Sequence, residues 1–192
     1  LFLLRSLLEQ IDINYFLLRD ELLENETALS WLIRMIFRNG LPSVRSFLRY
    51  LGQLIDVDYL QPNDINTNKY PDLIFILARL SRTISITKFS EHILFSAFPN
   101  GYISSDREKT WAYKDGIAIV QTQFRVSPRF CPLCVNSTPH VRLEWHLDWY
   151  RCCSIHHVML IERCPECKEL FDTETVIKQQ CRNCHHMFSK TE

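Results

Sequence analysis

Apolar positions recur at helical spacing through the first hundred residues, and the pattern predicts a mainly helical N-terminal part. Thr27 is a good N-cap for a first helix, which is expected to end at Asn39-Gly40. A second helix is expected to start at Ser43 and to end at Gly52. The expected buried faces are Leu29, Leu32, Ile33, Ile36 and Phe37 in the first helix and Val44, Phe47, Leu48 and Leu51 in the second.

The same spacing predicts a third helix after Asp72 and a fourth after the polar break at 81–85. The stretch QPNDINTNKYP (61–71) is polar and turn-rich, and it is expected to be a loop. Two helices joined by so short a break have helix-turn-helix spacing, although an ordinary antiparallel helix pair has it too. The expected buried faces are Leu73, Ile76, Leu77 and Leu80 in the third helix and Phe89, Ile93, Leu94 and Phe98 in the fourth.

Beyond residue 100 the helical period gives way to alternation, which predicts strands. GIAIVQTQF (116–124) is one such run, in a connecting segment at 101–128. RLEWHLDWY (142–150) is another, and its apolar face would comprise Leu143, Trp145, Leu147 and Trp149. At the other end of the chain, residues 1–24 are leucine-rich with acidic interruptions and suit a helix or a docking segment.

All eight cysteines lie in the last third of the chain, and most of them form C-x2-C pairs. A two-residue gap lets both side chains of a tight turn point at one ion, and two such turns complete a tetrahedral zinc site. The sequence therefore predicts two structural Zn²⁺ ions in closed sites that have no position for water. The predicted ligands are Cys131, Cys134, Cys153 and His156 for the first ion and Cys164, Cys167, Cys181 and Cys184 for the second.

Other arrangements of these residues stay open at this stage. Cys152 and His157 flank the second pair and could replace Cys153 and His156 as ligands. A cross-brace of alternate pairs, four disulfides, or an iron–sulfur cluster at the last four cysteines would use the same residues. Four other histidines of the last third are expected not to bind metal, and they are His140, His146, His185 and His186.

The charge balance points to no obvious substrate or nucleic acid, because 22 basic residues face 22 acidic ones. Residues 27–55 nevertheless carry four arginines and no acid, which suits a phosphate backbone, an acidic partner or simply a solvated face. These candidate contacts are Arg34, Arg38, Arg45 and Arg49, and Arg142 and Arg151 are candidates in the cysteine-rich part. No nucleotide-binding or hydrolase motif is present, and no apolar run is long enough to span a bilayer. We expect a non-enzymatic cytoplasmic protein, with no small-molecule substrate and no membrane contact.

Two regions of the chain, the start of the first expected helix and the cysteine-rich part, resemble the TniQ family of transposition proteins. ETALSWLIRMIFRNG (26–40) is similar to the motif that starts the first helix of that family. FCPLC (130–134), YRCCSIHHVMLIERCPEC (150–167) and CRNC (181–184) are similar to its zinc region. The chain departs from the family pattern at Thr27-Ala28 and at the extra Cys152.

The resemblance implies an N-terminal helix-turn-helix domain followed by two tandem zinc ribbons. The corresponding boundaries are 25–100 for the helical domain, 129–163 for the first ribbon and 164–192 for the second. It also implies a target-selection adaptor of the short form found in CRISPR-associated transposons. Such an adaptor links an RNA-guided CRISPR effector and its guide RNA, at the target DNA, to the AAA+ ATPase TnsC. A free-standing zinc-containing helix-turn-helix regulator that binds DNA is the alternative.

Overall fold

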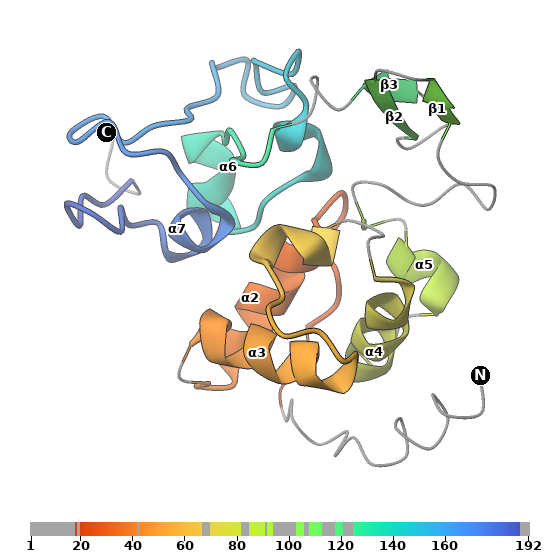
Figure 1. Cartoon of the computed structure of the whole chain (residues 1–192). Helices are drawn as coiled ribbons and strands as arrows, with labels where there is room; N and C mark the ends of the chain where they lie inside the picture. The colour runs from red at the N-terminus through yellow and green to blue at the C-terminus, as the bar shows by residue number, and fades with distance from the viewer. Residues whose placement is uncertain are drawn as a thin grey trace.

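A computed structural model describes residues 18, 20–41, 43–66, 70–81, 85–90, 92–93, 103–105, 108–112, 118–120 and 125–188. Figure 1 shows a helical unit, a small sheet beside it, and a cysteine-rich region in which most of the chain has no regular secondary structure. The first fifteen residues, and with them most of the predicted N-terminal docking segment, lie outside the described residues. The described helices are all too short to cross a membrane.

Helix α2 (Ala28–Arg38) is the central element of the helical unit, and its ends are those predicted. The Thr27 hydroxyl accepts a hydrogen bond from the Ser30 backbone N–H at 3.2 Å, which caps the first turn. Asn39 is the C-cap, and Gly40 follows with a positive φ of 65°. The helix is buried on nearly all sides because α3 (Val44–Leu54), the 3₁₀ turn η2 (Pro62–Asn66) and α7 (Thr173–Lys178) all contact it.

Helix α3 starts next to the predicted start, with Ser43 as its N-cap, but the prediction that Gly52 ends it was wrong. The helix continues to Leu54, with Gly52 buried inside it. A Cβ at this glycine would lie 2.6 Å from the carbonyl oxygen of Val57. Gly52 is therefore present because the following turn passes too close for a side chain, and its function is not to stop the helix.

Helices α4 (Pro71–Ser81) and α5 (Ile86–Ser90) complete the helical core. The predicted inward positions of the third helix are buried, as are Phe89 and Ile93 of the fourth, while Leu94 and Phe98 lie outside the described residues. Trp31 and Phe89 meet edge to face at 5.5 Å, which joins α5 to α2. Asp72 lies in the first turn of α4 instead of capping it, because Pro71 already begins the helix. The region is helical as predicted, and its assignment as a helix-turn-helix remains a prediction.

Three short antiparallel strands form the sheet, in the order β1 (Ile103–Ser105), β2 (Glu108–Ala112) and β3 (Ala118–Val120). The register pairs Ser104 with Lys109 and Trp111 with Ile119. Strand β3 falls within the alternating run at 116–124, so that prediction was correct for the residues the structure describes.

The predicted strand at 142–150 was wrong, because the segment forms the 3₁₀ turn η5 (Leu143–His146) and further turns. Leu143, Trp145 and Leu147 are buried as expected, but Trp149 is 48% exposed. Among the described residues this segment pairs with no strand: it has only isolated bridges, at Arg142 (with Glu26) and at Leu147, and the chain between them turns back on itself. The alternating hydrophobic pattern therefore predicted most of the buried side chains correctly, but it did not predict the backbone conformation.

The cysteine-rich region contains one apolar core that spans both predicted ribbons. Phe130 precedes the first cysteine, and its ring centroid lies 5.0 Å from that of Phe171 and 5.6 Å from that of Phe188. Phe171 and Phe188 contact each other at 4.7 Å. The two halves of the region therefore share their packing.

Candidate metal centres

The first group of metal-binding side chains comprises the three cysteines and the histidine predicted from spacing: Cys131, Cys134, Cys153 and His156. Their ligand atoms all lie within 4.8 Å of one another. The Cys134 and Cys153 sulfurs are 3.6 Å apart, and His156 Nδ1 lies 3.2 Å from Cys134 Sγ and 3.5 Å from Cys131 Sγ. A tetrahedral ion with metal–sulfur bonds of about 2.3 Å requires edges of about 3.8 Å, so the separations suit one ion.

The second group consists of Cys164, Cys167, Cys181 and Cys184, again within 4.8 Å. Its measured sulfur–sulfur separations are 3.5 Å for Cys164 with Cys184 and 3.5 Å for Cys167 with Cys181. Consecutive pairs share a group in both cases, so the ligands are arranged sequentially and not as a cross-brace. Within the described residues these two groups are the sets whose ligand atoms come close enough to hold a metal.

Three of the four ligand pairs lie on turns with the same backbone geometry. In each turn the residue after the second ligand has a positive φ, at His157, Lys168 and His185. Its N–H donates to the carbonyl of the first ligand at 2.9–3.0 Å. The N–H of the first ligand donates to the carbonyl of the residue directly after the positive-φ residue, at 2.8–2.9 Å. Two backbone hydrogen bonds thus close each turn and point both ligand side chains to one side.

The first pair is held differently, by the start of a helix. Cys131 is the N-cap of α6 (Pro132–Ser137), and Cys134 lies in its first turn. Pro132 suits the first helical position because a proline has no N–H to leave unbonded there. The Val135 N–H donates to the Cys131 carbonyl at 3.1 Å, which fixes the separation of the two sulfurs.

The thiols differ widely in acidity because burial and backbone N–H groups act on them to different extents, and neighbouring sulfurs add to this. Burial raises the pKa of Cys134 to about 12, and the neighbouring Cys153 and Cys131 add to this. Burial also disfavours the Cys153 thiolate, but the backbone N–H groups of His156 and Ile155 outweigh it and lower the pKa to about 7. The Glu169 N–H similarly lowers the pKa of Cys167 to about 6. Four sulfurs so close can all be thiolates only beside a divalent cation, so metal binding must release protons.

The alternative ligands lie outside both groups. Cys152 is exposed, and its nearest polar contact is the Cys153 carbonyl at 3.9 Å. His157 and His185 occupy the positive-φ positions of their turns, and neither belongs to a group. His140 and His146 are buried away from the ligands, and their Nδ1 atoms contact the carbonyls of Thr138 and Arg125, at 2.9 and 2.8 Å.

The six candidate arginines lie in different surroundings. Arg45 and Arg49 are exposed on α3, and Arg151 is exposed beside the second ligand pair. Arg38 is half-exposed and pairs with Asp20 at 2.8 Å. Arg142 lies next to Glu144 at 3.6 Å and over the Trp145 ring at 5.9 Å.

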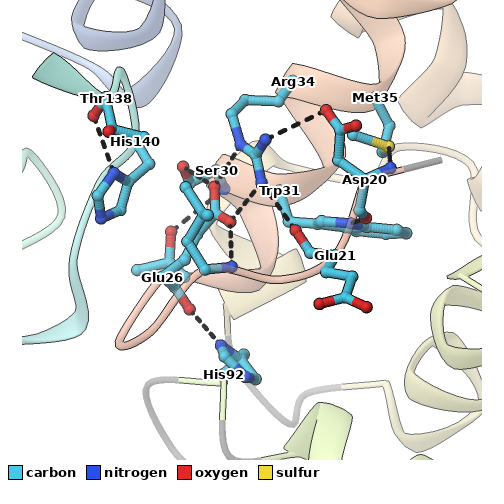
Figure 2. A network of polar contacts seen from close by, with 12 residues as sticks. Asp20, Glu21, Glu26, Ser30, Trp31, Arg34, Met35, His92, Thr138 and His140 are labelled. Carbon is cyan, nitrogen blue, oxygen red and sulfur yellow. Dashed lines mark hydrogen bonds and ion pairs between the residues drawn. The ribbon is translucent and has the colours of Figure 1, made fainter. Parts of the chain in front are cut away.

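Arg34 is the exception, because a buried carboxylate holds it (Figure 2). Its Nε and Nη2 atoms donate to the two oxygens of Glu26 at 2.8 and 2.7 Å. The Ser30 hydroxyl donates to the same carboxylate at 2.7 Å, and the Leu23 N–H does so at 3.0 Å. The Glu26 side chain is 0% exposed, so these four bonds satisfy a fully buried charge.

Sequence reasoning did not identify this network, although a signal was present. Glu26, Ser30 and Arg34 recur at intervals of four, which places polar residues along one side of an otherwise apolar helix. All three belong to the segment that resembles the start of the TniQ first helix. The segment's polar positions therefore have a structural role inside the protein.

Comparison with known families agrees with this geometry. The TniQ family model matches residues 17–160, three quarters of the 192 residues. The matched range contains the helical unit, the Glu26 network and the first group of metal-binding side chains, and it ends before the second. A search of curated proteins finds no match. The chain belongs to the TniQ family of transposition-associated proteins.

Proposed function

We propose that this protein is a non-enzymatic target-selection adaptor in DNA transposition. It links an RNA-guided CRISPR effector and its guide RNA, at the target DNA, to the AAA+ ATPase TnsC, and so recruits the transposase. The observation that carries the proposal is the family match over residues 17–160, since the family is associated with transposition and is generally non-catalytic. Its place of action would be the cytoplasm of a bacterium, with no small-molecule substrate and no membrane.

Both groups of metal-binding side chains would hold Zn²⁺. Sulfur-rich sets with at most one imidazole are the usual ligands of structural zinc, and the measured separations fit a tetrahedron. When bound, zinc with four protein ligands would act as a cross-link and offer no position to a reacting water. The eight side chains would then serve to hold the cysteine-rich region in shape, which is consistent with an adaptor.

Contacts with nucleic acid or a protein partner would come from the exposed arginines. Support is strongest for Arg45 and Arg49, which lie one turn apart on α3, a helix without acidic residues. Arg151 is the corresponding candidate in the cysteine-rich region. Arg34 has the least support, because its guanidinium is bonded to Glu26.

The adaptor role is tested by binding of the zinc-loaded protein to its own TnsC, with ATP and duplex DNA present. We expect association with TnsC, and we expect the protein alone to show no nuclease or strand-transfer activity. An Arg45→Glu/Arg49→Glu variant measures the contribution of α3 to this binding. Absence of TnsC binding, together with tight binding of the protein alone to one duplex sequence, would instead indicate a free-standing regulator.

A further inference from the structure

Helix α2 is contacted at its two ends by two different loops of the cysteine-rich region. The first loop, residues 135–152, connects the second and third ligands of the first group, Cys134 and Cys153. The second loop, residues 168–180, connects Cys167 and Cys181 of the second group. A bound ion would close each loop at its base.

The first loop holds the N-terminal end of α2 through backbone hydrogen bonds. The Thr27 N–H donates to the Val141 carbonyl at 2.9 Å, and the Leu143 N–H donates to the Asn25 carbonyl at 2.7 Å. The Ser30 hydroxyl accepts from the Val141 N–H at 2.9 Å. The same hydroxyl donates to Glu26, so it connects the first loop to the buried carboxylate shown in Figure 2.

The first loop is in turn fixed from the metal side. Val141 and Trp145 are buried in the same apolar core as Cys131, Cys134 and Cys153. If the ligands separate, this core loses its closure and the loop loses its fixed position. The backbone groups of Val141 and Leu143 would then no longer bond to Thr27, Asn25 and Ser30 at the buried N-terminal end of α2.

The second loop holds the C-terminal end of α2 by packing. It contains α7, which lies against α2 (Figure 1). Ile177 packs on the helical core, and Lys178 Nζ lies 4.8 Å from the centre of the Phe37 ring. Phe37 is in the last turn of α2, so this contact is at the opposite end from Thr27 and Ser30.

We propose that the two metal groups form a clamp on α2, in which each group mainly sets the order of one end of the helix. The first controls the N-terminal end through Val141, and the second controls the C-terminal end through α7. Metal loss at one site would therefore loosen the helical unit locally and alter the surface offered to partners. The proposal rests on metal binding by both groups, and it does not depend on the adaptor role.

Hydrogen exchange of the full-length protein tests the clamp, because backbone amides report on each end. At the N-terminal end the reporters are the amides of Thr27 and Trp31, and at the C-terminal end those of Asn39, Gly40 and Leu41. In Cys131→Ser/Cys134→Ser we expect exchange at the N-terminal reporters to rise about tenfold or more, with a smaller change at the other end. In Cys181→Ser/Cys184→Ser we expect the reverse.

Two variants that keep all metal ligands separate the clamp from general unfolding. Ser30→Ala removes the acceptor of the Val141 N–H, and Ile177→Ala removes a packing contact of α7. We expect each to raise exchange at its own end of α2 while two metal ions stay bound. Cys152→Ser changes an exposed cysteine outside both groups and is the control.

The clamp is refuted if Ser30→Ala and Ile177→Ala leave exchange unchanged, or raise it equally at both ends. It is also refuted if removal of one metal leaves the matching end protected. Metal content distinguishes failure of the clamp alone from failure of the zinc assignment. A wild-type chain without metal refutes both the zinc assignment and the clamp. Failure to bind TnsC with end-specific exchange intact refutes only the adaptor role.

Discussion

Replacement of Arg34 by methionine is the perturbation whose cost the structure defines best. Arg34 donates two hydrogen bonds of 2.8 and 2.7 Å to Glu26, and it is itself only 15% exposed. Methionine fills similar volume but leaves the Glu26 carboxylate with Ser30 and the Leu23 N–H as its remaining donors. Removing one partner of a buried ion pair costs about 3–5 kcal/mol, so we expect a loss of that order in the free energy of unfolding.

Equilibrium urea unfolding of the metal-loaded protein, followed by circular dichroism, measures this loss. Arg45→Met is the matched control, because Arg45 is exposed on the neighbouring helix, and it should change stability by no more than about 0.5 kcal/mol. Glu26→Met combined with Arg34→Met removes both charges, so the double variant should recover part of the loss.

The reasoning is refuted if Arg34→Met costs no more than Arg45→Met. It is also refuted if the costs of the two single variants simply add, so that Glu26→Met/Arg34→Met is less stable than Arg34→Met by the full cost of Glu26→Met alone. The two side chains would then not be coupled. Either result would make Arg34 a candidate for phosphate contacts again, like Arg45 and Arg49.

Three further predictions concern other parts of the chain. Cys131→Ser should lose about one metal ion and loosen the first loop of the cysteine-rich region, as elemental analysis and near-ultraviolet circular dichroism would show, whereas Cys152→Ser should keep both ions; metal loss from Cys152→Ser would contradict the ligand assignment. Gly52→Ala should cost about 1–3 kcal/mol in urea unfolding, because its Cβ would meet the Val57 carbonyl oxygen at 2.6 Å, and unchanged stability would show that this turn yields easily. Burial lowers the pKa of His146 to about 4, below its unfolded value of about 6.5, so the unfolded chain takes up the proton first; stability present above pH 6.5 should fall by about 1.4 kcal/mol per unit as pH drops towards 4. The His146→Leu variant keeps all the metal ligands and should lack this pH-dependent loss of stability. Identical pH profiles for the variant and the wild type would show that His146 does not cause it.

The metal-binding residues were predictable because tight turns impose their spacing locally. A two-residue gap is required wherever two side chains of one turn reach one ion, so the pattern is visible without knowledge of the fold. The same holds for the caps of α2, since Thr27 and Asn39-Gly40 act within a few residues of themselves. Which pairs lie close enough to share an ion depends on the fold, and in the structure consecutive pairs form one group.

The features that sequence reasoning missed depend on contacts between distant residues. Gly52 resembles a helix stop unless the return of the chain at Val57 is known. Arg34 resembles an exposed cation until Glu26 is seen to be buried beside it. The alternation at 142–150 resembles a strand until the tertiary structure shows the 3₁₀ turn at Leu143–His146 and the isolated bridge from Arg142 to Glu26, more than a hundred positions earlier. In each case local pattern identified the residue and tertiary structure decided its role.

The central claim is that each of the two groups holds one metal ion and that these ions maintain the structure on which the adaptor role depends. Elemental analysis of the purified chain, paired with its protein concentration, measures this most directly. We predict two zinc ions per wild-type chain and one in each of Cys131→Ser/Cys134→Ser and Cys181→Ser/Cys184→Ser. A wild-type chain that contains fewer than two ions, or a count that either double substitution leaves unchanged, would contradict the claim.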